Sequence, residues 1–187
     1  MMSIELLLDA ALDARIRAEW NTLLLAGLPS QARHSGASNA PHVTLLAAEA
    51  VEVGVVGVGA VGAGVLPAEV QLSGFAVFGA GPKGLVLSRL VVVSRELQAL
   101  HAAVHAAATG LIGLSELTAV DRWTPHITLA SRLTPAQLGA AIELLAPPPA
   151  PHPQPTEPPA PHPQPHVGRA VALRHWNGTT KTLTALA

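Results

Sequence analysis

The sequence contains no cysteine and few charged residues. Because cysteine is absent from all 187 residues, disulfides, thiolate nucleophiles and cysteine–zinc sites are excluded. Charged residues make up 12% of the chain and the formal net charge is −1. This balance does not favour the broad basic surface that binds long duplex nucleic acid. Any phosphate-bearing ligand must therefore be held by a few local groups.

Long hydrophobic runs are also missing. The longest uncharged apolar stretch, residues 53–68, is shorter than the ~20 residues that a membrane-spanning helix needs. Residues 1–5 lack the basic region that begins a secretory signal. We therefore expect a cytoplasmic protein with no membrane partner. Apolar residues still make up 49% of the chain, enough for the core of one compact domain.

An order of elements occurs twice along the chain. Residues 4–8 predict a buried strand, followed by a helix with Asp9 as its N-cap. Residues 85–93 predict a second strand, followed by a helix with Ser94 as its N-cap. In both cases a loop leads to Pro-His-x-Thr-Leu after nearly the same number of residues. This predicts an α+β fold with two pseudo-symmetric lobes of antiparallel strands, outer helices and a central cleft.

We expect one bilobal domain over residues 1–187. One lobe comprises roughly residues 1–80 plus the C-terminal strands, and the other comprises residues 81–146. Between them and the C-terminal strands, composition changes to a proline-rich, low-complexity insert at residues 147–166. Proline supplies no backbone donor for a helix or sheet, so we expect this insert to be a solvated linker.

Three further elements are predicted from local signals. Residues 69–78 form a hairpin with the strand at 85–93. Thr134 begins a capping box for a helix that ends near Ala146. The chain closes with a hairpin around Asn177-Gly178.

The motif His-x-Thr-Leu occurs at residues 42–45 and at residues 126–129. With 9 histidines in the sequence, roughly 0.09 copies are expected by chance. In a strand, residues i and i+2 share a face, so each histidine lies beside its threonine. Imidazoles titrate near neutrality, so one can accept a proton while the other donates one. The alternative is two buried polar pairs that merely satisfy each other.

These residues resemble the paired motifs of the 2H phosphoesterase superfamily, and the order of elements is most similar to bacterial 2′-5′ RNA ligases. The resemblance implies His42 and His126 as catalytic residues, with Thr44 and Thr128 binding phosphate. It implies hydrolysis of 2′,3′-cyclic phosphates on RNA ends or nucleotides, together with ATP-independent 2′-5′ ligation. Members often carry an arginine five residues after the second histidine, where this chain has serine; we expect the next residue, Arg132, to bind phosphate.

The paired histidines need no metal and no cofactor for this chemistry. We expect His126 to be the base and His42 the acid, in a monomer. Two other functions remain open. In the first, the protein is a phosphodiesterase for a small cyclic nucleotide or ADP-ribose cyclic phosphate. In the second, it is a non-catalytic module that binds RNA ends.

Other motifs favour structural roles. The GxGxxG string at residues 57–62 lacks the long helix and the acidic residue of a dinucleotide site, so we interpret it as a packed glycine-rich segment. His101 and His105 have the spacing of a zinc pair but no evident third ligand, so we interpret them as packed. Trp123 is equally suited to base stacking and to the core. Arg33 and Arg122 also flank the motifs, where each is suited either to contact the phosphate or to remain a solvated surface charge.

Overall fold

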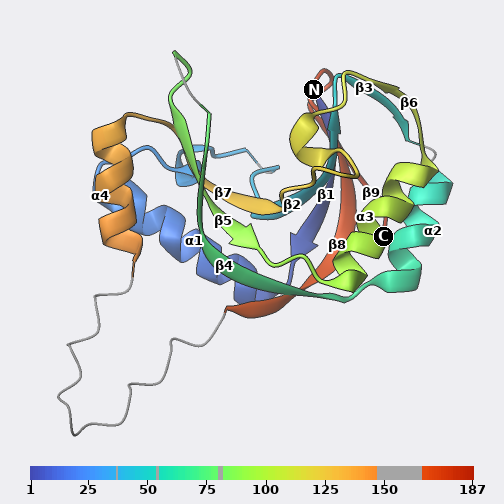
Figure 1. The fold of residues 1–187 in the computed structure, drawn as a ribbon, viewed down its shortest axis with the longest axis horizontal. Coiled ribbons are helices and arrows are strands. Elements are labelled where there is room, and N and C mark those ends of the chain that lie inside the picture. The colour runs from blue at the N-terminus through green and yellow to red at the C-terminus, as the bar shows by residue number, and fades with distance from the viewer. Residues whose placement is uncertain (37, 54, 80–81, 147–165) are drawn as a thin grey trace, which may run out of the picture.

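The computed structural model describes residues 1–36, 38–53, 55–79, 82–146 and 166–187. The predicted proline-rich insert, apart from its last residue, lies outside the described residues. The fold is α+β, as predicted: the described strands pair in antiparallel fashion, and helices pack against them (Figure 1). No helix in the described ranges is long and apolar enough to cross a membrane.

The elements have the following bounds. The strands are β1 (Met2–Leu8), β2 (His42–Ala48), β3 (Ala50–Val53), β4 (Ala68–Phe78), β5 (Leu85–Val91), β6 (Ala108–Ile112), β7 (His126–Leu133), β8 (Val167–Asn177) and β9 (Thr182–Ala185). The helices are α1 (Ala10–Leu25), α2 (Val55–Val65), α3 (Arg95–Ala107) and α4 (Pro135–Leu145), with short 3-10 turns η1 (Gln31–Arg33) and η2 (Glu116–Thr118).

The main sheet is curled so that its two edges approach each other. Its strand order is β2-β1-β8-β4-β5-β7, with β9 also paired to β8. The two edge strands, β2 and β7, nevertheless contact each other, and they meet near the centre of Figure 1. These are the strands that begin with His42 and His126. The curl of the sheet therefore brings together two motifs that lie far apart in the sequence.

Two segments of the chain have the same internal order, and we call them the first unit (β1, α1, β2) and the second unit (β5, α3, β7). The predicted N-caps of their helices are confirmed. The Asp9 carboxylate accepts from the Leu12 amide at 2.8 Å, and the Ser94 hydroxyl accepts from the Leu97 amide at 3.1 Å. The repeat seen in the sequence is therefore a repeat of structure. The assignment of whole lobes stays a prediction.

Each of the two helices packs against the motif strand of the other unit. Helix α1 contacts β7, and α3 contacts β2. A buried ion pair holds α1 in this position: Arg89 on β5 donates to both carboxylate oxygens of Glu19, at 2.9 and 3.0 Å. The Arg89 guanidinium also lies 4.0 Å from the centroid of the Phe75 ring. The two units are thus interlocked rather than placed side by side.

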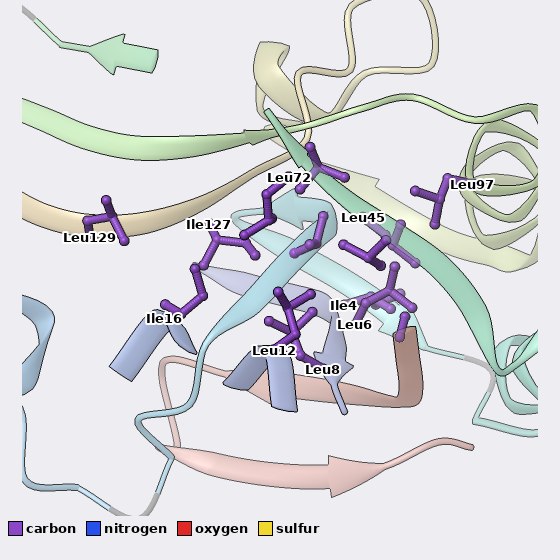
Figure 2. Close-up of a cluster of buried hydrophobic side chains, with 14 of the residues drawn as sticks. Ile4, Leu6, Leu8, Leu12, Ile16, Leu45, Leu72, Leu97, Ile127 and Leu129 are labelled. Atoms are coloured by element: carbon purple, nitrogen blue, oxygen red, sulfur yellow. The ribbon is translucent and has the colours of Figure 1, made fainter. Parts of the chain in front are cut away.

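The core lies between the inner faces of the sheet and these helices (Figure 2). It takes alternate residues from the strands and one face of each helix, as the strand and helix periods require. Fully or almost fully buried members include Ile4, Leu6, Leu12, Ile16, Leu45, Leu97, Ile127 and Leu129. The leucine that ends each His-x-Thr-Leu motif therefore belongs to the core, while the histidine and threonine are only partly buried.

Of three local predictions from the sequence, two are confirmed and one is corrected. The GxGxxG string lies inside helix α2, where Gly62 packs against the Leu173 side chain so closely that a Cβ atom would overlap it. This confirms the packed glycine-rich segment. The C-terminal hairpin turns over more residues than Asn177-Gly178, because Asn177 pairs with Thr182. The Asn177 side chain accepts from two amides inside this turn. The predicted capping box at Thr134 is confirmed.

Candidate active site

The two motif strands carry the same irregularity at the same place. In β2, Thr44 pairs with Glu5 of β1 and Leu46 pairs with Ile4, which leaves Leu45 as an extra residue. Such a β-bulge bends the strand and changes the direction in which neighbouring side chains point.

In β7, Thr128 pairs with Ser88 of β5 and Ala130 pairs with Leu87, which leaves Leu129 as the extra residue. The bulge therefore falls on the leucine of His-x-Thr-Leu in both copies. Each histidine and its threonine precede the bulge and share one face of their strand.

His42 and His126 are oriented by equivalent hydrogen bonds. The Nδ1 atom of His42 lies 2.8 Å from the carbonyl oxygen of Ala40, and Nδ1 of His126 lies 2.7 Å from that of Thr124. A carbonyl can only accept, so Nδ1 carries the hydrogen in both rings. In the neutral imidazole this leaves Nε2 as the proton acceptor. Both rings therefore have the same atom available for proton transfer.

The surroundings of the two histidines differ in charge. His42 lines a pocket of about 490 Å³ together with Glu5, Arg174 and Trp176. Its Nε2 atom lies 3.7 Å from Oε1 of Glu5. In the second unit, the residue opposite the motif threonine is Ser88 rather than an acid. A carboxylate therefore stands near His42 at a position where the second unit has none.

Glu5 is itself held by two contacts. The Nε atom of Arg174 donates to Glu5 Oε2 at 2.7 Å, and the Ser3 hydroxyl donates to Oε1 at 2.6 Å. All three side chains are buried. Sequence reasoning did not identify Glu5 or Arg174. The available signal was Glu5, the one charged residue of a mainly apolar strand, because a buried charge requires a partner.

His126 lies in a more apolar environment. Its ring centroid is 4.4 Å from that of Phe78 on β4. Burial lowers the pKa of His126, the carbonyl of Thr124 partly opposes this shift, and the charge of His42 lowers the pKa further. The two rings lie on strands that contact each other. His126 does not line the pocket that holds His42 and Glu5.

The backbone carbonyl of each motif threonine accepts a hydrogen bond from a tryptophan in the segment that leads to the other motif. Trp20 on α1 donates through its indole Nε1–H to the carbonyl of Thr128 at 3.0 Å. Trp123 donates in the same way to the carbonyl of Thr44 at 3.0 Å. One face of Trp123 is stacked on His101, with centroids 4.2 Å apart and planes at 8°. That face is therefore unavailable for stacking a base.

The three arginines that flank the motifs occupy different positions. Arg33 lines the pocket of His42, and it also lines an adjoining hollow of about 310 Å³ with Ser131 and Arg132. Arg132 has a positive φ of 62° and is exposed. Arg122 lies 3.5 Å from Glu116 in an exposed ion pair. Of the three, Arg33 is therefore the one that lines the pocket of a catalytic candidate.

His101 and His105 are packed, as expected. His101 is buried, and its Nε2–H donates to the carbonyl of Thr118 at 3.0 Å. Burial lowers its pKa to about 4, with a smaller contribution from the charge of His105. The Nε2–H of His105 donates to the carbonyl of Leu45 at 3.2 Å. Within the described ranges, no three side chains of the usual metal-binding types gather into a site.

Of the comparisons with known proteins, the one with protein families gives a match. The search of curated proteins gives no match. The family described as the 2'-5' RNA ligase superfamily matches residues 12–154, which include both histidine motifs and most of the chain. The protein belongs to the 2'-5' RNA ligase superfamily.

Proposed function

We propose that the protein hydrolyses 2′,3′-cyclic phosphates at RNA ends or on nucleotides, with His42 and His126 as general acid and base. The observation that supports this best is the matched orientation of the two rings. Both Nδ1 atoms are held by a carbonyl two residues earlier, so both Nε2 atoms are available at the approach of β2 and β7. Two imidazoles in opposite protonation states are the groups that such a reaction requires.

We assign the base to His126 and the acid to His42. The lowered pKa of His126 keeps its ring neutral at physiological pH, as a base must be. The carboxylate of Glu5, 3.7 Å from Nε2 of His42, gives a protonated His42 a counter-charge. In the reaction, Nε2 of His126 takes a proton from water, whose oxygen bonds to phosphorus. The bond from phosphorus to one ribose oxygen breaks, and His42 protonates that oxygen.

The phosphate contacts in this proposal come from Thr44, Thr128 and Arg132. The two hydroxyls lie on the same strand faces as the histidines and can donate to phosphate oxygens. Arg132 lies further along β7, in the hollow that it shares with Arg33 and Ser131. A guanidinium from that hollow adds positive charge close to a phosphate that carries more charge after ring opening.

The same arrangement supports ATP-independent 2′-5′ ligation as a second activity, with a ribose hydroxyl of a second RNA end in place of water. A small cyclic nucleotide or ADP-ribose cyclic phosphate is the alternative substrate. The low charge of the chain favours that alternative, since long RNA is usually bound by many cations. The monomeric state and the cytoplasmic location also remain predictions.

The test is the hydrolysis of cytidine 2′,3′-cyclic phosphate, and of an oligonucleotide with a cyclic phosphate end, in the presence of EDTA. We expect activity to persist in EDTA. We expect His42→Ala and His126→Ala each to reduce turnover by about 10²–10⁴-fold. The double variant should be far less than multiplicatively worse, because both groups act in one transition state. A matched control is His166→Ala, since that histidine contacts Arg15 rather than either motif.

Melting temperatures of the same preparations separate lost chemistry from lost folding. Near-wild-type turnover in either folded histidine variant contradicts the assignment. Loss of activity in EDTA, with recovery on adding a divalent cation, contradicts the two-histidine mechanism. Binding of cyclic-phosphate ends without turnover in the wild-type protein supports the non-catalytic alternative instead.

A further inference from the structure

We infer that Trp20 and Trp123 are positioning residues, each of which orients the motif threonine to which its indole donates. The inference builds on the proposed function, because it concerns how the phosphate-binding threonines are held. Trp20 serves Thr128, and Trp123 serves Thr44. Neither indole is required to touch the substrate.

The first argument is that both indoles reach the same atom of the motif. Each donates at 3.0 Å to the carbonyl of a threonine that directly precedes a β-bulge. A bulge disrupts the hydrogen-bond ladder locally and sets the direction of nearby side chains. A partner on that carbonyl therefore restrains the peptide that carries the threonine hydroxyl. A repeat of this contact in both motifs is not expected of packing alone.

The second argument is that both tryptophans are themselves held firmly. Next to Trp20 on α1, Glu19 is fixed by its two hydrogen bonds to Arg89 on β5. Trp123 is stacked on His101 of α3, whose ring is fixed in turn by the carbonyl of Thr118. A donor on a rigid support restrains its acceptor, whereas a donor on a mobile side chain follows it.

The third argument is the position of His105. His105 on α3 and Trp20 on α1 lie at the same distance from the N-caps Ser94 and Asp9. His105 donates to the carbonyl of Leu45, the bulge residue of the first motif. The same helix position thus supplies a ring N–H to the motif of the other unit in both halves of the fold. Both units therefore have a ring N–H donor at this helix position, which is an indole in the first unit and an imidazole in the second.

A crossed pair of double-mutant cycles tests the inference. Trp20→Phe keeps an aromatic ring and removes the donor, and we expect roughly a tenfold loss of kcat with a small change in KM. In a Thr128→Val background that loss should shrink to less than about twofold, since the threonine it orients is gone. In a Thr44→Val background it should stay roughly tenfold. Trp123→Phe should show the opposite pattern, coupling to Thr44 and not to Thr128.

The pattern is discriminating because Trp123 lies close in sequence to Thr128 and far from Thr44. Coupling that follows sequence proximity, or equal effects in both backgrounds, overturns the inference. A rescue variant separates positioning from packing. Trp20→His restores a ring N–H like that of His105 but fills less space, so we expect a lower melting temperature and a higher kcat than in Trp20→Phe. Higher activity in the phenylalanine variant assigns Trp20 to packing alone.

A second measurement does not depend on turnover. In NMR spectra, Trp20→Phe should shift the ring resonances of His126 more than those of His42, and Trp123→Phe should shift those of His42 more. If the wild-type protein hydrolyses no cyclic phosphate, the proposed function fails while these shifts still decide the positioning role. If activity is present but the shifts show no crossed pattern, the positioning role alone is wrong.

Discussion

At the scale of single residues, His42 and His126 each make the same kind of hydrogen bond through Nδ1, but their surroundings differ. Each Nδ1–H is held by a carbonyl. Beyond that, Phe78 covers the ring of His126, while Glu5 stands beside Nε2 of His42. The identical motifs therefore have different surroundings. In the proposed reaction, burial suits His126 to the neutral base, and the Glu5 carboxylate gives a protonated His42 a counter-charge.

The pH dependence of the rate should report this difference. We expect a bell-shaped profile of kcat/KM, whose acidic limb reflects protonation of the base. The pKa of His126 is lowered, so this limb should lie below the ordinary histidine value of about 6.5. Phe78→Ala exposes the ring to water and should move the limb to higher pH. The measurement is kcat/KM for cytidine 2′,3′-cyclic phosphate from pH 4.5 to about pH 9.

Assigning the base to the other ring makes a different prediction. If the acidic limb responds to Glu5→Gln and not to Phe78→Ala, the base is His42. If neither substitution moves it, the two surroundings do not set the roles of the histidines.

A repeated pattern marks candidate residues in the sequence. His42, Thr44, His126 and Thr128 are candidates because chance rarely produces the motif twice, and the structure brings their two strands into contact. Residues without a pattern were missed. Glu5 contacts His42 only through the pairing of β1 with β2, and its partner comes from β8. Nothing in the local sequence specifies which strands pair, so such contacts become visible only in the fold.

At the scale of elements, the two N-caps are equivalent in sequence but not in structure. The Ser94 hydroxyl accepts only from the Leu97 amide among the described contacts. The Asp9 carboxylate accepts from the Leu12 amide and, through Oδ2, from the Arg169 amide of β8 at 2.7 Å. Asp9 therefore both begins α1 and ties it to the sheet.

Removing these caps should have unequal effects on stability. We expect Ser94→Ala to lower the free energy of unfolding by about 1 kcal/mol, the usual contribution of an N-cap. Asp9→Ala should lower it by about 2 kcal/mol, because the Arg169 amide also loses its acceptor. Urea unfolding of both variants measures the difference. Equal losses indicate that water replaces the second contact at no cost.

Secondary structure was predictable where a cap or a period marked it. Helices α1, α3 and α4 each begin at a cap that the sequence indicates. Helix α2 and the small sheet of β3 and β6 were not predicted. The glycines of α2 are poor helix formers, and Gly62 is explained by its close contacts with Leu173 and Ala187, which the local sequence does not show. The longer turn after Asn177 depends on side-chain bonds that the Asn-Gly signal does not contain.

At the scale of the whole molecule, full or partial burial favours the neutral form of several histidines, and this should make the fold sensitive to acid. Burial lowers the pKa of His101 to about 4 and lowers those of His126 and His175. Below pH 6.5 the unfolded chain takes up protons that the folded protein does not. Stability should therefore be full above about pH 6.5 and fall progressively toward pH 4.

His101 should account for much of that loss. The difference between its folded and unfolded pKa corresponds to at most about 3 kcal/mol. In His101→Phe the ring still stacks on Trp123, but it no longer titrates. We expect the variant to lose less stability between pH 7 and pH 4.5 than the wild type does, as measured by melting temperature. An unchanged acid sensitivity assigns the effect to other groups.

The crossed packing of α1 and α3 has a consequence for the division of the chain into fragments. A fragment that contains only one unit lacks the helix that covers its own motif strand. Two identical copies of such a fragment, however, can each supply the helix that the other needs. Fusion of two copies makes that exchange intramolecular and removes its dependence on concentration. The two halves then need not be identical: Glu5 pairs with Thr44 in the first unit, whereas Ser88 pairs with Thr128 in the second.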